Sequence, residues 1–194
     1  MIMVFARAPV PGAVKTRLIS RLGAWGAARL HLRLTRHALA TAAAARCGPV
    51  ELHLTRRHGL FKAARVQRGA ELGSRMQHAF AKAKRPAILI GADCPQLTAA
   101  DLRQAMRWLR CGYDAVLAPA EDGGYALVAL RRPIPALFRG IEWGSERVYA
   151  QSVQKLAGYR WRALRTVRDV DRPEDLERVR WLRFASACRR AAPR

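Results

Sequence analysis

The sequence is poor in acidic residues and has no long hydrophobic run. Of its 194 residues only 14 are Asp or Glu, whereas 36 are Lys or Arg, which gives a formal net charge of +22. No apolar run reaches the roughly 18 residues of a membrane-spanning helix, so the sequence predicts none. The apolar run near the N-terminus is short and broken by Arg7, unlike a secretory signal. We therefore expect a cytoplasmic protein.

Cysteine and histidine are scarce and scattered. The four cysteines contain no Cys-x-x-Cys pair, so neither a structural zinc site nor a disulfide framework is predicted. The five histidines show no metal-ligand spacing, and the Gly-Lys-Ser/Thr run of a Walker A loop is missing. The cysteines are expected to act as small hydrophobic side chains.

The overall composition is that of an ordinary globular protein, with 51% hydrophobic and 26% charged residues. The length suits one domain, and no linker or internal repeat divides the chain. We expect a single domain over residues 1–188 and a basic tail over residues 189–194.

The positive charge raises nucleic acid as a partner, but its distribution argues against a dedicated nucleic-acid module. Arginine and alanine are both in excess along the whole chain, which is typical of compositional drift. The dense clusters at Arg56–Arg57 and Arg189–Arg190 have no interleaved aromatic side chains on which bases could stack. A small ligand that carries phosphate fits the charge equally well.

Short apolar runs alternate with amphipathic helical patterns. Strands are predicted at residues 2–5, 50–54, 88–90, 115–117 and 125–130, with an edge strand at 163–170. Helices are predicted at residues 14–46, 73–84, 99–110, 145–157 and 172–188. Thr98 and Asp101 have the spacing of a capping box. This alternation indicates an α/β sheet covered by helices on both faces.

The first predicted strand leads into a stiff loop rich in proline and glycine, residues 6–18, with cations at Arg7, Lys15 and Arg17. Ligands of open α/β sheets bind at the carboxyl ends of strands, where a helix N-terminus favours an anion. The same residues would also suit an ordinary strand-to-helix turn with solvated cations.

Acidic residues gather at the other predicted strand ends, in or beside the segments 91–95, 119–125 and 169–176. Eight of the 14 do so: Asp93, Asp101, Glu121, Asp122, Asp169, Asp171, Glu174 and Asp175. Asp93 could bind a divalent metal or form a turn. Asp171 could ligate the same metal or cap the last helix with Glu174. A metal–diphosphate site needs carboxylates for the metal and cations for the diphosphate. The few acidic residues of the chain gather opposite the cationic loop, as such a site requires.

Six ordered motifs give the chain a resemblance to the DUF2064 family, also called radical-SAM/selenodomain-associated transferase 1. They are FARAP…KTRL (5–18), GAELGSRM (69–76), GADCP (91–95), PAEDGGY (119–125), IEW (141–143) and DVDRPEDL (169–176). The resemblance implies a three-layer αβα domain of the GT-A, nucleotide-diphospho-sugar transferase type, with a mostly parallel mixed sheet. The sequence departs from the family pattern after Trp143, where it has Gly144-Ser145 and the family more often has Ser-Thr.

The resemblance also implies site residues. The nucleotide would be held by Ala6, Arg7, Ala8, Pro9, Gly12, Lys15, Arg17 and Arg75. Asp93 and Asp171 would hold a divalent metal, Mg²⁺ or Mn²⁺. Glu121, Asp122 and Lys15 would act in catalysis, and Gly123, Gly124, Tyr125 and Trp143 would face the sugar or acceptor.

The predicted function is metal-dependent transfer from a nucleotide-diphosphate sugar to a small-molecule acceptor. One alternative is a nucleotidyltransferase that joins a nucleoside triphosphate to a small phosphorylated acceptor. Another is a basic nucleic-acid-binding protein without catalysis. The sequence does not indicate the base, the sugar, the acceptor or the oligomeric state.

Overall fold

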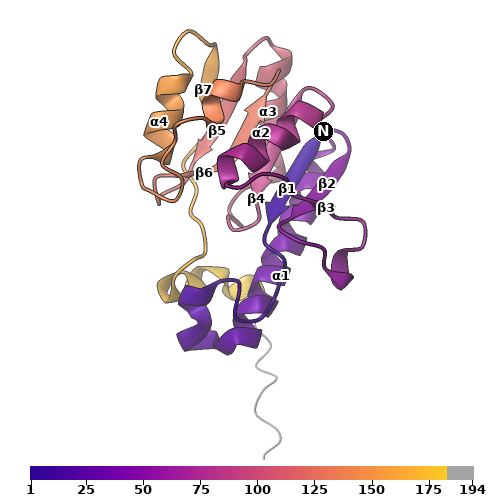
Figure 1. Ribbon diagram of the computed structural model, residues 1–194, viewed down its shortest axis with the longest axis vertical. Coiled ribbons are helices and arrows are strands. Elements are labelled where there is room, and N and C mark those ends of the chain that lie inside the picture. The colour runs from indigo at the N-terminus through magenta and orange to yellow at the C-terminus, as the bar shows by residue number, and fades with distance from the viewer. Residues whose placement is uncertain (183–194) are drawn as a thin grey trace, which may run out of the picture.

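The computed structural model describes residues 1–182, and the predicted tail at 189–194 lies outside them. A sheet of seven described strands, in the order β3-β2-β1-β4-β6-β5-β7, forms the middle layer (Figure 1). The strands are β1 (Ile2–Ala6), β2 (Val50–Leu54), β3 (Arg65–Val66), β4 (Ala87–Gly91), β5 (Ala115–Pro119), β6 (Tyr125–Leu130) and β7 (Trp161–Ala163).

The sheet is mixed but mostly parallel, as expected. Strand β1 pairs in parallel with β2 and β4, while β6 runs antiparallel to both of its neighbours, β4 and β5. Residue Phe5 lies beside Gly91 in the β1–β4 register. Because these two central strands are parallel, the chain leaves both of them at the same edge of the sheet.

Helices cover both faces of the sheet and complete three layers. They are α1 (Ile19–Ala45), α2 (Leu72–Lys82), α3 (Ala99–Arg110) and α4 (Val148–Lys155). Helices α1 and α3 bury one face, around side chains such as Ile88 and Leu102, and α2 and α4 cover the other, around Phe80 and Leu89. No helix within residues 1–182 is long and apolar enough to cross a membrane.

A third, smaller apolar cluster lies beyond the carboxyl edge of the sheet. There the 3₁₀ segments η1 (Thr16–Leu18) and η4 (Pro173–Leu182) pack with the first turns of α1 around Leu30 and Leu34 (Figure 1). The chain therefore returns, after β7, to the loop that leaves β1.

Three predicted elements differ from the structure. Helix α1 does not begin at Val14, because Lys15 adopts the left-handed conformation (φ 48°) and only a 3₁₀ turn precedes Ile19. The edge strand lies at residues 161–163 rather than 163–170. Beyond it Val167 still makes an isolated parallel bridge to Ala120, and the chain then turns toward Asp93. The last helix is a 3₁₀ segment, and its predicted part beyond residue 182 lies outside the described residues.

The predicted capping box of Thr98 and Asp101 at the start of α3 is confirmed. The Thr98 hydroxyl accepts from the Asp101 amide, and the Asp101 carboxylate accepts in return from the Thr98 amide at 2.9 Å. These two bonds satisfy amides that the helix leaves open, so residue type alone fixes the start of the helix.

Asp114 joins three segments at the far end of the sheet. Its carboxylate accepts from Arg131 at 2.5 Å and from the Arg160 amide at 3.1 Å, and these bonds lower its pKa. Asp114→Asn should lower the free energy of unfolding at pH 7 by about 1–2 kcal/mol, because a charge-assisted bond is lost.

The difference between wild type and Asp114→Asn should depend on pH. A lowered carboxyl pKa adds stability above the unfolded pKa of about 3.9, and this stability is lost as the pH falls below it. Denaturant unfolding at pH 7 and pH 3 measures this, with Glu146→Gln as an exposed control. Equal stability of wild type and Asp114→Asn at pH 7 would contradict the assigned role.

Candidate functional site

The candidate site lies where the loop after β1 meets the segment after β4. The amide of Ala92 donates to the Phe5 carbonyl at 3.1 Å, which continues the pairing of the two strands to their ends. Asp93 follows at once, so the fold places its carboxylate beside the cationic loop.

The loop after β1 turns tightly and directs one cation inward. Gly12 adopts a positive φ of 78°, and the Ala13 amide donates to the Val10 carbonyl at 3.0 Å. Lys15 then takes a left-handed conformation that non-glycine residues rarely adopt. This turn carries the Lys15 side chain into the protein, where it is only 5% exposed.

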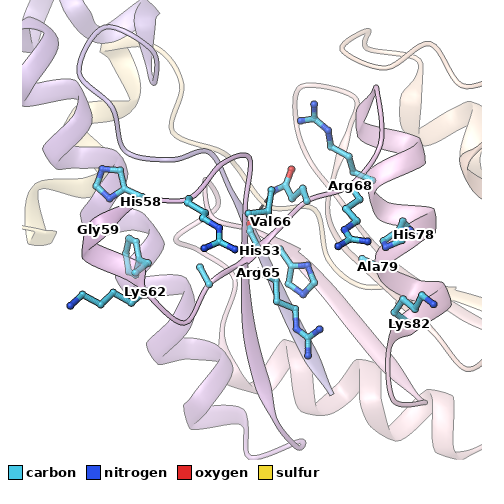
Figure 2. Close-up of a pocket in the computed structure, with 15 residues that line it drawn as sticks. His53, His58, Gly59, Lys62, Arg65, Val66, Arg68, His78, Ala79 and Lys82 are labelled. Carbon is cyan, nitrogen blue, oxygen red and sulfur yellow. Dashed lines mark hydrogen bonds between the residues drawn. The ribbon is translucent and has the colours of Figure 1, made fainter.

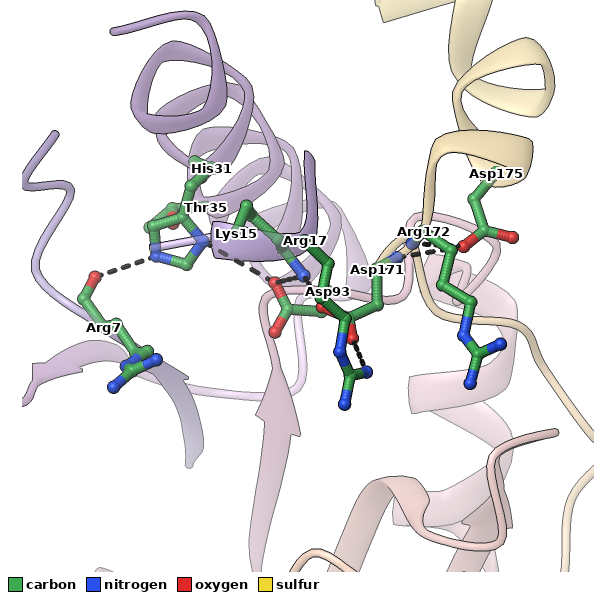
Figure 3. Close-up of polar contacts among 9 residues, drawn as sticks. All are labelled: Arg7, Lys15, Arg17, His31, Thr35, Asp93, Asp171, Arg172 and Asp175. Carbon is green, nitrogen blue, oxygen red and sulfur yellow. Dashed lines mark hydrogen bonds and ion pairs between the residues drawn. The ribbon is translucent and has the colours of Figure 1, made fainter. Parts of the chain in front are cut away.

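Lys15 brings two distant carboxylates together around its ammonium (Figure 3). Its Nζ lies 2.8 Å from Asp93 Oδ1 and 3.7 Å from Asp171 Oδ1. Arg17 pairs with the other oxygen of Asp171 and stays 65% exposed. These four residues come from three segments, and the structure thus brings together Lys15, Arg17, Asp93 and Asp171, which the sequence analysis names as site residues.

The charges of the cluster hold one another ionised. Burial favours the neutral amine of Lys15, but the carboxylates of Asp93 and Asp171 outweigh it and raise the Lys15 pKa. Burial likewise opposes ionisation of Asp93, but Lys15 and His31 hold its pKa well below its usual range. The Asp93 side chain remains 45% exposed although Oδ1 is buried, so its other oxygen faces solvent.

His31 belongs to the cluster and is not predicted by the sequence. Its ring, 2% exposed, bonds the Arg7 carbonyl through Nε2 at 2.9 Å, and its Nδ1 lies 3.6 Å from Asp93 Oδ1 (Figure 3). The imidazole is therefore held by the loop after β1 and stands beside the Asp93 carboxylate. A lone histidine on a helix carries no local signal, since only the tertiary fold places α1 behind both segments.

The remaining loop residues form the wall of the site. Ala6, Ala8 and Pro9 are buried, and the Ala8 amide donates to the Thr55 hydroxyl at 3.2 Å. The Arg7 side chain points to solvent while its carbonyl is held by His31.

Asp171 is free to face Lys15 and Arg17 because another residue caps the following turn. The Asp175 carboxylate accepts from the amides of Asp171 and Arg172, at 3.1 and 2.8 Å (Figure 3). Asp175 thus takes the reciprocal capping position that the sequence assigned to Glu174.

A second group of acids lies near the first. Burial, reinforced by the charge of Asp122, raises the pKa of Asp169. Burial and the carboxylates around it also raise the pKa of the Cys94 thiol, which keeps the thiol protonated and unreactive. Glu121 pairs with Arg168, whereas the exposed Asp122 only accepts the Gly124 amide, at 2.9 Å.

The other residues predicted to face the sugar or acceptor lie between the site and the core. A Cβ on Gly123 would come 2.1 Å from the Glu146 carbonyl oxygen, so only glycine fits there. Tyr125 and Trp143 stack edge to face, with ring centroids 6.3 Å apart, and pack into the core beneath α2. Trp143 also lies against Gly73 of α2, where a Cβ would collide with its Nε1.

Arg75 lies at the start of α2, apart from the Lys15 cluster. Its guanidinium donates to the carbonyls of Gly69 and Ala70, at 3.0 and 3.4 Å, and closes the turn before the helix. It also lines a basic pocket beside β3.

Carboxylate oxygens are the donors that a divalent metal would find here. Within residues 1–182 no group of three or more His, Cys, Asp and Glu is arranged to hold an ion. Mg²⁺, however, is commonly bound by one or two carboxylates together with the phosphates of a substrate. The exposed oxygen of Asp93, with Asp171 close by, fits that arrangement.

The fold and parts of the sequence are shared with known proteins. The chain is similar to a crystal structure from Desulfovibrio desulfuricans G20 described as a "putative nucleotide-diphospho-sugar transferase". The match covers 98% of this chain and 90% of that one, at 31% identity and a TM-score of 0.84. Comparison with curated proteins gives no significant match.

More distant structures share the fold alone. CMP:2-keto-3-deoxy-manno-octonic acid synthetase complexed with CTP matches at 15% identity and a TM-score of 0.59, over 94% of this chain and 97% of that one. Rv0371c from Mycobacterium tuberculosis H37Rv, complexed with manganese, matches at 18% identity and a TM-score of 0.54, over 92% and 96%. The expected GT-A-like fold is thereby confirmed.

The family assignment rests on a second match. The family described as "Uncharacterized protein conserved in bacteria (DUF2064)" matches residues 21–145. As the six motifs of the sequence predicted, the chain belongs to the DUF2064 family.

Proposed function

We propose that the chain is a metal-dependent transferase that uses a nucleotide-diphosphate sugar as donor. The observation that carries this proposal is the buried Lys15 ammonium between Asp93 and Asp171, at the carboxyl ends of β1 and β4. Parallel α/β sheets bind their ligands at that edge. The similar Desulfovibrio structure, described as a nucleotide-diphospho-sugar transferase, supports the same assignment.

In this proposal the cationic residues hold the diphosphate. Lys15 supplies a positive charge at the floor of the site, and the exposed Arg17 guanidinium reaches outward from Asp171 to a phosphate oxygen. Asp93 and Asp171 would hold Mg²⁺ or Mn²⁺, and the bound metal would neutralise charge that develops on the leaving diphosphate. The manganese complex of Rv0371c, a protein of the same fold, agrees with that choice of ion.

The acceptor would approach from the side of Glu121 and Asp122. Arg168 engages Glu121, so Asp122 is the freer carboxylate and is positioned to accept a proton from an acceptor hydroxyl. Beside it lies Asp169, whose pKa is raised by burial and by the charge of Asp122. Gly123 and Gly124 keep side chains away from this approach, and Tyr125 and Trp143 support it from the core side.

Nucleotidyl transfer is the second candidate, because Lys15 and the two carboxylates would suit a triphosphate as well as a diphosphate. The two reactions release different products: a nucleoside diphosphate from sugar transfer and pyrophosphate from nucleotidyl transfer.

A thermal-shift screen of nucleotide sugars and nucleoside triphosphates, with Mn²⁺ or with EDTA, tests the proposal. A ligand at about 100 times its Kd should stabilise the protein by roughly 2.7 kcal/mol, and only with metal. Product analysis of the hits then separates the two reactions. Stabilisation that is the same in EDTA would contradict the metal-dependent proposal.

Arg17 offers a variant that changes binding without changing the fold. Arg17→Ala should weaken nucleotide affinity by about 1.5–3 kcal/mol, the contribution of a charge-assisted hydrogen bond. Its pair with Asp171 is exposed and contributes little to stability, so the melting temperature should hardly move.

Arg21→Ala is the matched control for Arg17→Ala. Arg21 is exposed, follows Arg17 by four residues and has no contact with the cluster within the described residues. Calorimetric titration of each variant should show normal affinity for Arg21→Ala. Equal losses at both positions would mean that the loop supplies only general positive potential.

A further inference from the structure

A second concave site lies away from the Lys15 cluster, over the edge strands β2 and β3 and against α2 (Figure 2). Its volume is about 920 Å³, at the upper end of the roughly 300–1,000 Å³ that small-molecule pockets occupy. Six lysine and arginine side chains line it: Arg57, Lys62, Arg65, Arg68, Arg75 and Lys82. None of its lining residues is acidic.

Most of these cations lack an internal counter-charge. Arg65 pairs with Glu51 at 2.9 Å, and Arg75 is engaged by backbone carbonyls. The other four make no ion pair or hydrogen bond within residues 1–182: Arg57, Lys62, Arg68 and Lys82. Like charges around one hollow repel one another, and a bound anion would relieve that repulsion.

The rest of the lining suits an organic phosphate. Three of the five histidines of the chain line the pocket: His53, His58 and His78. His53 Nε2 is bonded to Glu51 and His58 Nδ1 accepts the Leu60 amide, so each of these two rings has one nitrogen left for a ligand. Phe61 and Val66 give the same pocket an apolar wall. Cations with an apolar wall match a ligand that carries phosphate on a carbon framework.

The pocket adjoins the proposed donor site but does not share its charged cluster. Lys15, Arg17, Asp93 and Asp171 are not among its lining residues, whereas Gln67, which lines it, donates to the Ala6 carbonyl at 3.1 Å. Compositional drift would leave cations scattered, but it does not by itself gather them in a concave, acid-free pocket. We propose that this pocket is a second anion site that binds a phosphorylated small molecule independently of the nucleotide.

Calorimetric titration with inorganic tripolyphosphate in EDTA tests the proposal. Without metal, the carboxylates of Asp93 and Asp171 disfavour an anion at the donor site, so the basic pocket should account for the binding. Arg57→Ala combined with Arg68→Ala should weaken binding at least tenfold. Arg29→Ala combined with Arg36→Ala removes the same charge from exposed positions on α1 and should leave it unchanged.

No measurable binding to the wild type, or equal losses in the two double variants, would overturn the proposal. Arg17→Ala separates this proposal from the proposed function. It should bind tripolyphosphate normally while binding the nucleotide weakly, and loss of tripolyphosphate binding in Arg17→Ala would place the anion at the loop after β1 instead.

Discussion

Lys15→Met is expected to weaken nucleotide-diphosphate binding about 10- to 150-fold, because it removes a charge-assisted contact of about 1.5–3 kcal/mol. Methionine keeps much of the volume of lysine, so the change removes the charge rather than the packing. Stability should also fall, by about 1–3 kcal/mol, because the partly buried Asp93 loses its closest cation. Calorimetric titration and denaturant unfolding measure the two effects separately.

Lys155→Met is the control for this experiment. Lys155 is an exposed lysine at the end of α4, and its replacement should leave both nucleotide affinity and stability unchanged. Normal nucleotide affinity in Lys15→Met, even with reduced stability, would show that Lys15 is only a structural partner of Asp93.

Asp93→Asn is expected to abolish the part of nucleotide binding that depends on metal. The amide is a poor ligand for Mg²⁺ or Mn²⁺ compared with a carboxylate, although it has nearly the same shape. The apo protein should lose about 1–3 kcal/mol at pH 7, because the buried Lys15 keeps its charge without a counter-ion at 2.8 Å.

The stability difference between wild type and Asp93→Asn has a definite sign with pH. Because the folded pKa of Asp93 is lowered, its contribution is present above about pH 4 and is lost as the pH falls below that value. Asp171→Asn is the informative comparison: it should also lose metal dependence, but at a smaller cost in stability than Asp93→Asn, since Asp171 lies 3.7 Å from Lys15 and otherwise pairs with the exposed Arg17. Retained metal dependence in both variants would exclude them as ligands.

The sequence predicts most of the strands and the cap of α3, because the residues that determine these elements are neighbours along the chain. The alternating pattern at residues 50–54 and the apolar run at 125–130 coincide with β2 and β6, and Thr98 caps α3 as its type predicts. The periodicity predicts a helix from residue 14, whereas α1 begins at Ile19, because periodicity does not show that Lys15 takes a left-handed conformation.

The elements that were misplaced depend on distant contacts. The sequence predicts an edge strand over residues 163–170, yet β7 ends at Ala163. Val167 keeps an isolated bridge to Ala120, and the Val170 amide then donates to the Asp93 carbonyl at 2.9 Å. That contact draws the chain across the edge of the sheet and delivers Asp171 to Lys15.

The sequence predicts the candidate site only in part. Asp93 and Lys15 follow central parallel strands, so the rule that ligands bind at strand ends finds them from sequence order. His31 comes from the middle of α1, and the basic pocket combines β2, β3 and α2, so neither has a motif that could reveal it.

The central claim is that a metal and a nucleotide diphosphate meet at the Lys15 cluster. A crystal structure of the chain with Mn²⁺ and a nucleoside diphosphate, with anomalous data for manganese, tests it most directly. We expect a manganese peak at the exposed oxygen of Asp93, beside the carboxylate of Asp171, with the diphosphate against Lys15 and Arg17. A diphosphate in the basic pocket beside β3, with no manganese at Asp93, would contradict it.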